Sequence, residues 1–281
     1  MMVISVTNLD DAIEHYTNSR GYRLEMVVPA DAPRAARLSK GGESVQLVAN
    51  EKRIAENGKW ITGRAGMEYC DLIPGRMGGK VIASHIRLTK AGDAADYVHY
   101  HKIDFQMIYC KRGRIKVVYQ DQGEPLWLET GDCVLQPPEI RHRVLECTTG
   151  AEVIEIGMPA EHETWVEHDI TLPTLTINAA RDFGGQRFVR HIRAESSNFE
   201  VQSSQLRDDS NFEHGTLNSE IRRDLGIAAA TGGRYAAHVQ RLQPNVDLPT
   251  NYTNETEIGL FFKLNNNEML SLLLNNKSDQ P

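Results

Sequence analysis

Three histidines and a glutamine lie in the middle of the chain at spacings that suit a metal site. His99 and His101 are two residues apart, and side chains two apart on a strand point to the same face. A second expected strand, 105–110, places Gln106 on one of its faces, and His142 follows a proline corner later in the chain. Neutral imidazoles suit first-row transition metals, so three of them with one oxygen ligand and open positions predict a catalytic metal site.

This central stretch resembles the cupin family, whose two motifs both occur here in order. The first motif is a glycine, then His-x-His, a glutamate and another glycine. The second is Gly, five residues, Pro-x-Gly, two residues, His, three residues, Asn. The resemblance implies a double-stranded β-helix, the RmlC-like jelly roll, and a divalent transition metal, with Fe(II) favoured and Mn, Ni or Zn as alternatives. The matching positions are His99, His101, Gln106, Gly113, Gly131, Pro137 and His142.

Four positions depart from the cupin motifs. Gln106 replaces the usual glutamate, and Glu139 replaces the inner glycine. Glu146 replaces the asparagine, and Gly92 lies one residue too early. A neutral glutamine cannot act as the general base that a glutamate in its place could be, so we expect a proton acceptor outside the ligand set.

Several further residues are candidates for the chemistry. Glu139 and Glu146 flank His142 and are the expected proton acceptors, although a solvent-facing position for Glu146 is an equal alternative. Tyr109 and Tyr97 are expected to line or back the site, with a catalytic role for Tyr109 and a substrate contact for Tyr97.

An arginine close to the first motif is a candidate substrate ligand. Arg87 and His85 share one face of an expected strand, 81–88. A barrel-facing Arg87 would bind a substrate carboxylate bidentately, whereas a solvated strand face is the alternative. Arg141 and Arg143 are also compatible with an acidic ligand, although three arginines are weak grounds for one.

Three functions fit these residues. The resemblance to cupin dioxygenases implies oxygen-dependent C–C cleavage of a small dicarbonyl, enol or hydroxy-aromatic substrate, with a metal-assisted isomerase or hydrolase as rivals. The second function is a barrel that binds a small molecule without turnover, which the missing acid favours. The third is a scaffold with a vestigial site. The fold alone does not choose between them, because cupins host unrelated functions.

The composition is typical of a soluble globular protein, with 40% hydrophobic and 25% charged residues. The net charge of −7 argues against a nucleic-acid or anionic-membrane surface. No apolar run approaches the roughly 20 residues of a membrane span, and no signal peptide is apparent, so we expect a cytoplasmic location. The four cysteines lack metal-ribbon spacing, so we expect reduced core residues.

The N-terminal residues predict a strand, a helix and three further strands. Asn8 is a good N-cap, apolar residues recur after it at helical spacing, and Gly21 ends the helix. The segment resembles one module of the glyoxalase/bleomycin-resistance (vicinal oxygen chelate) superfamily. That family builds a site from two modules, with metal ligands on the first and last strands. Only one module is present here, and its strands 3–7 and 45–49 offer no histidine or acid, so we expect no metal there. We expect the barrel or a second copy in a homodimer to cover its open sheet face. The expected strands are 3–7, 22–28, 35–38 and 45–49.

The chain also repeats itself: residues 224–242 parallel 71–88 at an offset of 154, with one residue of slippage before the glycines. Such a repeat predicts a bicupin. The repeat lacks the metal ligands, and we expect a partial second cupin whose apolar segments pack on the first or on a second copy. The residues at the positions of His99, His101, Gln106 and Gly113 are Thr253, Glu255, Leu260 and Asn267.

The expected fold is therefore mainly β: a cupin jelly roll, preceded by an α+β βαβββ module and followed by a partial, degenerate second cupin. Phe183 and Phe188 are expected to anchor a polar arm on the barrel. The expected partners are an anionic or chelating small molecule and a second copy of the chain. The expected segments are 1–52 for the half module, 53–170 for the metal-binding barrel, 171–210 for the arm and 211–281 for the second cupin.

Overall fold

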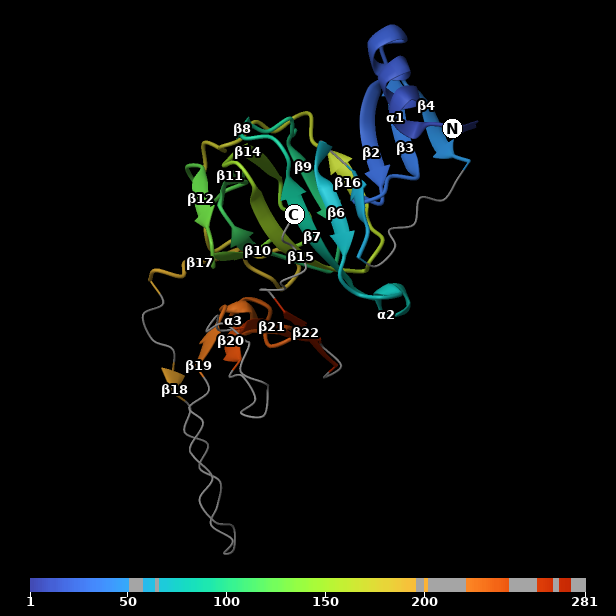
Figure 1. Ribbon diagram of the computed structural model, residues 1–281. Coiled ribbons are helices and arrows are strands. Elements are labelled where there is room, and N and C mark those ends of the chain that lie inside the picture. The colour runs from blue at the N-terminus through green and yellow to red at the C-terminus, as the bar shows by residue number, and fades with distance from the viewer. Residues whose placement is uncertain are drawn as a thin grey trace, which may run out of the picture. The chain divides into compact units, whose positions relative to one another are not determined.

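The chain is mainly β, as predicted, and divides into two compact units, Met1–Ile192 and Arg193–Pro281 (Figure 1). The structure is a computed structural model that describes residues 1–50, 58–63, 66–195, 200–201, 221–242, 257–264 and 268–273.

The first unit begins with the predicted strand–helix–strand–strand–strand module. Asn8 caps the helix, because its Oδ1 accepts hydrogen bonds from the backbone N–H groups of Asp10 at 3.0 Å and Asp11 at 3.3 Å. Gly21 follows the helix with a φ of 68°, the left-handed conformation common at helix ends. The elements are β1 (Met2–Val6), α1 (Leu9–Glu14), a π-helix (His15–Ser19), β2 (Arg23–Val28), β3 (Ala35–Lys40) and β4 (Glu43–Ala49).

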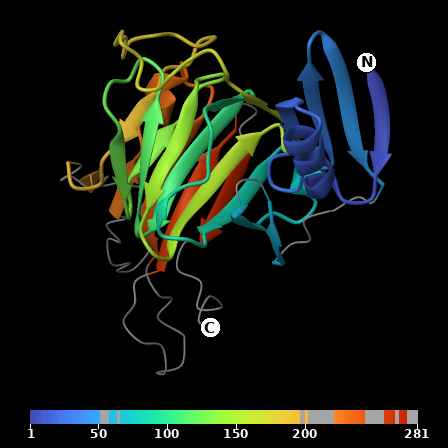
Figure 2. The same cartoon turned by 90° about the horizontal axis from the view of Figure 1, so that it is seen from above.

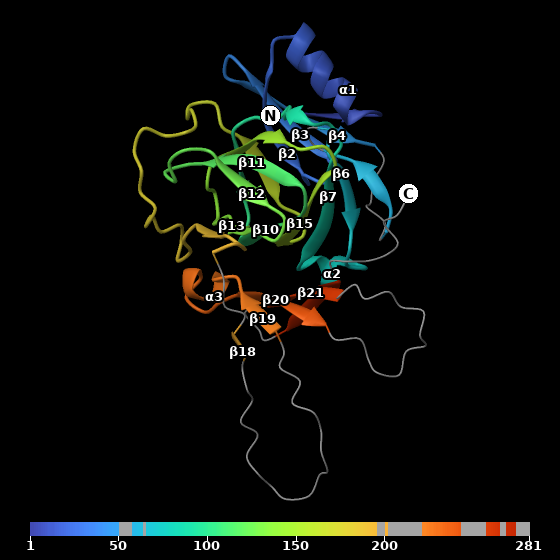
Figure 3. The same ribbon diagram turned by 60° about the vertical axis from the view of Figure 1, so that its left-hand side comes forward.

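Helix α1 lies on one face of a sheet with the order β1-β4-β3-β2 (Figures 2 and 3). Leu9 of the helix packs on Leu38 and Leu47 of the strands, and both strand leucines are fully buried. Burying one such side chain stabilises a fold by about 1.5–3 kcal/mol, so the module has a small core of its own. Its kinship with the vicinal-oxygen-chelate superfamily remains a prediction.

The module's sheet continues into the barrel without a break. Strand β2 pairs with β16 (Glu163–Val166), with Val27 opposite Thr164 and Met26 opposite Trp165. The barrel therefore extends the edge of the module's sheet, and the predicted covering of the open sheet face remains a prediction. The remaining strands of this sheet are β9 (His99–Lys102), β14 (His142–Cys147), β11 (Arg114–Tyr119) and β12 (Leu126–Glu129), with β8 (Gly92–Asp93) on β14.

A second sheet completes the barrel. Consecutive strands from β9 onward pass repeatedly between the two sheets, which is the connectivity of a jelly roll. Apolar side chains such as Val117, Leu128 and Val153 fill the space between them. The second sheet contains β17 (Val189–His191), β13 (Cys133–Leu135), β10 (Phe105–Arg112), β15 (Ala151–Met158), β7 (Ile82–Leu88), β6 (Glu68–Asp71) and β5 (Trp60–Thr62), and α2 (Arg76–Gly79) precedes β7.

The segment after β16 runs along the outside of the barrel, as the polar arm was predicted to do (Figure 3). Phe183 is buried in the barrel core, and Phe188 packs against it. Strand β17 then pairs with β13, so residues 171–192 belong to the first unit. The division of the chain at residues 52, 170 and 210 remains a proposal.

The second unit is an antiparallel sheet. Strand β20 falls on β7 at the predicted offset of 154, and a short helix precedes each. The Leu225 N–H donates to Ala237 at 3.0 Å, as the Leu72 N–H does to Ala83 at 2.8 Å. The elements, in sheet order, are β18 (Glu200–Val201), β19 (Ile221–Asp224), β20 (Ala236–Leu242), β21 (Glu257–Lys263) and β22 (Met269–Leu273), with α3 (Ile227–Ala230) between β19 and β20.

One strand pairing in the second unit differs from the corresponding pairing in the first unit. Strand β20 pairs directly with β21, whereas β15 lies between β7 and β10 in the barrel. Of the second-copy positions, Leu260 is buried in β21, and Thr253, Glu255 and Asn267 lie outside the described residues. The bicupin organisation therefore remains a prediction.

The four cysteines are free and buried, as expected for reduced core residues. Burial raises the pKa of Cys110 to about 12 and also raises the pKa of Cys147. Among the residues described, no helix is long and apolar enough to cross a bilayer.

Because Cys110 and Cys147 have raised pKa values, their thiols are expected to stay protonated and unreactive at pH 8, where an exposed cysteine is partly thiolate. Native protein treated with iodoacetamide at pH 8 should show little alkylation of these two residues by mass spectrometry. Protein unfolded in urea should be alkylated at both. Rapid alkylation of Cys110 in the native protein would contradict the buried placement.

A buried ion-pair cluster ties the module to the barrel. Arg76 donates from Nη2 to Asp31 at 2.5 Å and from Nε to Asp71 at 2.6 Å. The side chains of Asp31 and Asp71 are only 6% and 3% exposed. Burial disfavours the charge on Arg76, but the two carboxylates raise the pKa of Arg76 above its usual value. The guanidinium therefore stays charged between two acids that have little access to water.

Replacing Arg76 with glutamine should leave both buried carboxylates without a cation, which typically costs about 3–5 kcal/mol. All three tryptophans of the chain lie in the first unit, so urea unfolding followed by tryptophan fluorescence measures this unit. Arg34→Gln is the matched control, because the Arg34–Glu161 pair is more exposed and its loss should cost less than about 1 kcal/mol. Equal effects of the two substitutions would rule out the structural role of the cluster.

Candidate metal centre

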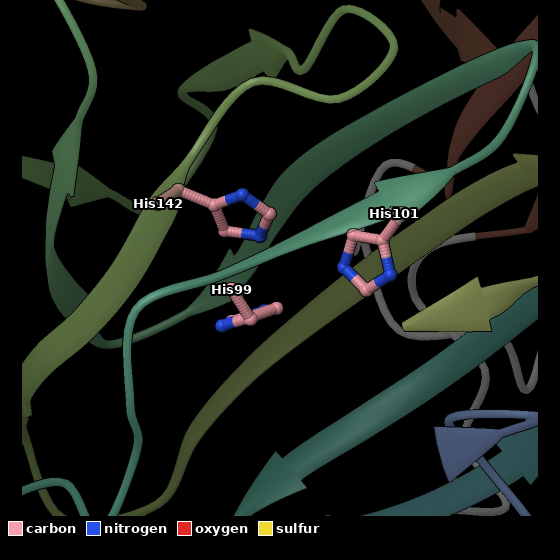
Figure 4. A group of neighbouring side chains, drawn as sticks. All are labelled: His99, His101 and His142. Carbon is pink, nitrogen blue, oxygen red and sulfur yellow. The ribbon is translucent and has the colours of Figure 1, made fainter. Parts of the chain in front are cut away.

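The three predicted histidines converge inside the barrel. His99 and His101 point inward from β9, and His142 enters from β14, where it is paired directly with His99. The ring of His99 lies 4.2 Å from that of His142 and 5.1 Å from that of His101, between centroids. Each imidazole contributes a nitrogen to a group whose atoms all lie within 4.8 Å of one another, and all three are buried (Figure 4).

Hydrogen bonds set the tautomer of these imidazoles. Nδ1 of His99 lies 2.8 Å from the Tyr97 carbonyl oxygen, and Nδ1 of His142 lies 3.0 Å from that of Ile140. A carbonyl oxygen can only accept, so both Nδ1 atoms carry a proton, and in the neutral imidazole this places the lone pair on Nε2. This is the form in which histidine binds metals, so the site fits a divalent transition metal.

The third imidazole is oriented by another strand. Nδ1 of His101 lies 2.9 Å from the hydroxyl oxygen of Thr164, a fully buried residue of β16. His162 packs edge-on against the same ring, with 5.2 Å between centroids. Asp96 holds the neighbouring segment, because its carboxylate accepts from the Val144 N–H at 3.0 Å. These contacts limit rotation of the rings toward other positions.

Gln106 is at the predicted fourth position and has an unexpected partner. It is 3% exposed, and its Nε2 donates to Oε1 of Glu155 at 2.5 Å. Glu155 belongs to β15, the strand next to β10, and it lines the same cavity. The carboxylate orients the amide nitrogen of Gln106, which leaves the amide oxygen as the group that can face a metal.

The cavity at these residues is small and mostly apolar, with a volume of about 70 Å³. Tyr119 lines it, stacks on His142 and accepts a hydrogen bond from Gln136 at 3.1 Å. Complete burial raises the pKa of Tyr119 well above its usual value, so its hydroxyl keeps a proton to donate to a ligand. The remaining lining residues are Ala30, Met67, Tyr69, Ile86, Leu88, Ile108, Ile115, Val117, Val144 and Val153.

Arg87 does not have the barrel-facing position that was considered for a substrate ligand. Its neighbours Ile86 and Leu88 line the cavity, so Arg87 points to the outer face of β7. There its guanidinium lies 3.7 Å from the ring centroid of Trp60, and its Nε lies 3.5 Å from Glu152. No lysine or arginine occurs among the described residues that line the cavity.

Two tyrosines that were expected at the site also lie outside the cavity lining. Tyr109 is buried, but it points to the opposite face of β10 from Gln106. Tyr97 contributes its backbone carbonyl to His99, and its ring packs edge-on against that histidine at 5.9 Å. Tyr97 therefore backs the site as a support for a ligand rather than as part of the wall.

The two predicted proton acceptors point away from the imidazoles. Glu139 is exposed and has a φ of 58°, a left-handed conformation that explains why the cupin motif has glycine there. Glu146 lies 3.9 Å from Lys116, with its side chain 42% exposed. A register shift between β11 and β14 separates Glu146 from the inward face that His142 and Val144 share.

Three residues of the site were not predicted: Glu155, Tyr119 and Thr164. Tyr119 shares a face with Ile115 and Val117, so strand alternation alone would have placed it in the barrel. Glu155 and Thr164 are on strands far from the two motifs, and they reach the site only through strand pairing.

The hydrogen bond between Gln106 and Glu155 predicts how exchanging the amide and the carboxylate changes thermal stability. Gln106→Glu places two carboxylates at hydrogen-bond distance, so the metal-free variant should lose thermal stability at neutral pH. The double variant Q106E/E155Q restores one amide and one carboxylate and should recover most of the loss. Thermal unfolding followed by tryptophan fluorescence measures both. A double variant no more stable than Gln106→Glu would show that the two groups do not interact.

A scan against protein-family models and a search of curated proteins found no match to this chain. Among solved structures it is similar to an RmlC-like cupin from Shewanella frigidimarina, with 26% identity over 36% of this chain and 84% of that one, and a TM-score of 0.30. It is also similar to KdgF from Halomonas sp., with 18% identity over 36% of this chain and 87% of that one, and a TM-score of 0.30. A third similar structure is oxalate decarboxylase from Bacillus subtilis, with 10% identity over 63% of this chain and 54% of that one, and a TM-score of 0.40. The jelly-roll assignment rests on the strand order of the two sheets and not on these alignments.

Proposed function

We propose that this chain is a metal-dependent cupin enzyme that carries out dioxygenase-type chemistry on a small dicarbonyl, enol or hydroxy-aromatic substrate. The observation that supports a metal is the convergence of three buried imidazoles, two of them held by carbonyl oxygens in the tautomer that binds metals. His99, His101 and His142 would hold the metal, with the Gln106 amide oxygen as the fourth group. Fe(II) is the favoured ion, with Mn, Ni and Zn as alternatives.

The side chains around the imidazoles have distinct parts in this proposal. A divalent metal, when bound, supplies Lewis-acid stabilisation of an enolate-type oxygen. Tyr119 would donate a hydrogen bond to a ligand oxygen, because its phenol stays protonated. The aliphatic side chains of the wall exclude water, which strengthens the polar contacts that a ligand makes.

Glu155 supports an enzyme over a binding protein. The sequence contained no acid at the ligand position, and that gap favoured binding without turnover. Glu155 brings a carboxylate into the cavity beside Gln106, within 2.5 Å of its amide nitrogen. It is the one carboxylate among the described residues that line the cavity, whereas Asp96 lies behind His99, with its Oδ1 3.7 Å from Nδ1 of that imidazole. With three neutral imidazoles and a neutral amide, it would also offset part of the charge of a divalent ion.

The proposed ligand is a small chelating molecule, and its attraction to the site comes from the metal rather than from arginine. No cationic side chain was found in the described cavity wall, so the acidic ligand suggested by Arg87 has no direct support there. A homodimer, a cytoplasmic location, the bicupin organisation and the kinship of the N-terminal module are further proposals.

Elemental analysis and oxygen uptake test the function together. Protein loaded anaerobically with Fe(II) should hold roughly one ion per chain and consume oxygen with a member of a panel of short β-diketones, enols and catechols. His99→Ala and His101→Ala should lower the metal content at least about tenfold and abolish uptake. His15→Ala, an exposed position on the module, is the control and should change neither.

The outcomes separate the alternatives. Metal binding and a ligand-induced thermal shift without turnover would favour the small-molecule binding protein. Wild-type protein that holds no iron, manganese, nickel or zinc, and is not stabilised by adding them, would overturn the enzyme and leave a scaffold with a vestigial site.

A further inference from the structure

One residue of the cavity wall comes from outside the barrel. Ala30 belongs to the loop between β2 and β3 of the N-terminal module, whereas the other lining residues belong to barrel strands and their connections. The module is therefore part of the site, although it contributes no metal ligand. Its loop, residues 29–33, is the segment that reaches the cavity.

The loop is held in this position from two sides. The carboxylate of Asp31 is fixed by Arg76 at 2.5 Å, and Arg76 is in turn bound to Asp71 at 2.6 Å. Ala32 is 3% exposed, so the loop is packed against its surroundings on both sides of Asp31. The contacts of Asp31 and the burial of Ala32 therefore hold Ala30 beside the cavity.

Gly63 allows this close approach. A Cβ atom at Gly63 would collide with the backbone carbonyl oxygen of Asp31 and would lie 2.8 Å from the Tyr69 ring. Backbone oxygen cannot yield as a flexible side chain can, so any larger residue at this position must push the loop outward. Tyr69 itself lines the cavity, so the contact lies directly beside the wall.

The size of the cavity limits what can bind. A cavity of about 150 Å³ lined by aliphatic side chains binds benzene in another protein, whereas this one has about half that volume. The cavity with the loop in place is therefore smaller than one known to hold an aromatic ring. A chain of a few heavy atoms with two oxygen donors does fit, and its short apolar part would contact the aliphatic wall.

We propose that the 29–33 loop sets the size limit of the site, with Ala30 as the specificity-determining residue, and that the ligand is an acyclic dicarbonyl or enol rather than a hydroxy-aromatic. This inference rests on the proposed metal-dependent function, because it assigns a substrate class to that site. It gives the N-terminal module a role: it supplies the wall that excludes larger chelators.

Two hydroxamates that share a chelating group test the size limit. Protein loaded with Co(II) is titrated with acetohydroxamate and with benzohydroxamate, and the visible Co(II) spectrum follows binding. The wild type should bind acetohydroxamate at least tenfold more tightly. Ala30→Gly should reduce that ratio to below threefold, because a methyl group leaves the wall, and Ala30→Leu should weaken both ligands at least tenfold. Ala91→Leu, at an exposed alanine away from the cavity, should match the wild type.

A measurement on metal-free protein separates this proposal from the metal site. Diethyl pyrocarbonate modifies accessible imidazoles, and mass spectrometry can compare His99, His101 and His142 with exposed His15 in the same sample. Gly63→Ala and Ala30→Gly should each raise the modification rate of the three buried histidines at least fivefold relative to His15.

If the wild type does not bind Co(II), but the histidines of the loop variants are modified faster than those of the wild type, the metal function is removed. The loop then still stands as the wall of the cavity. An unchanged hydroxamate ratio in Ala30→Gly together with unchanged affinities in Ala30→Leu, or unchanged modification rates in both loop variants, would overturn the loop as the size limit.

Discussion

The candidate site depends on one constraint: each imidazole must turn a nitrogen without a proton toward the same point. Two histidines meet it locally, since each places Nδ1 against the carbonyl oxygen of the residue two positions before it. His101 instead relies on Thr164, and Thr164 is held in register by Val27 of the module on its other side. Hydrogen bonds therefore connect the N-terminal module through β16 to His101, so the orientation of this imidazole depends on strands from both parts of the first unit.

The site has both an amide and a carboxylate beside the imidazoles, on two neighbouring strands. Strand β10 carries an amide where cupins usually carry a carboxylate, and the adjacent strand carries the acid. The amide can still present an oxygen, and the acid can still offset positive charge, because paired strands bring their inward side chains together. An ion held by the three imidazoles and this amide would lack direct ligation by an acid, which would make it more strongly Lewis acidic toward an oxygen ligand.

The jelly roll was expected from the resemblance to the two cupin motifs, and the convergence of the histidines from strand alternation, which acts over a few residues. The residues that were placed wrongly or missed depend on a register shift or on contacts between distant segments. Glu146 follows His142 at an even spacing, but the register shift beside it reverses the face, and no local pattern marks that shift. Arg87 could not be assigned a face, because Ala83 and His85 on its own side of β7 are as buried as the inward residues. Glu155, Thr164 and Ala30 reach the cavity through contacts between distant segments, which a single sequence does not reveal.

The junction of β2 with β16 has a consequence for how copies of this chain meet. Without the module, β16 would be a free edge whose backbone N–H and C=O groups could recruit a strand from another molecule, one strand away from the imidazoles. The module occupies that edge, and among the described strands β1, where Met2 and Val3 are exposed, is the outermost strand on this side of the sheet. Strand addition at β1 would therefore lie at the far edge of the module from the cavity that the imidazoles line.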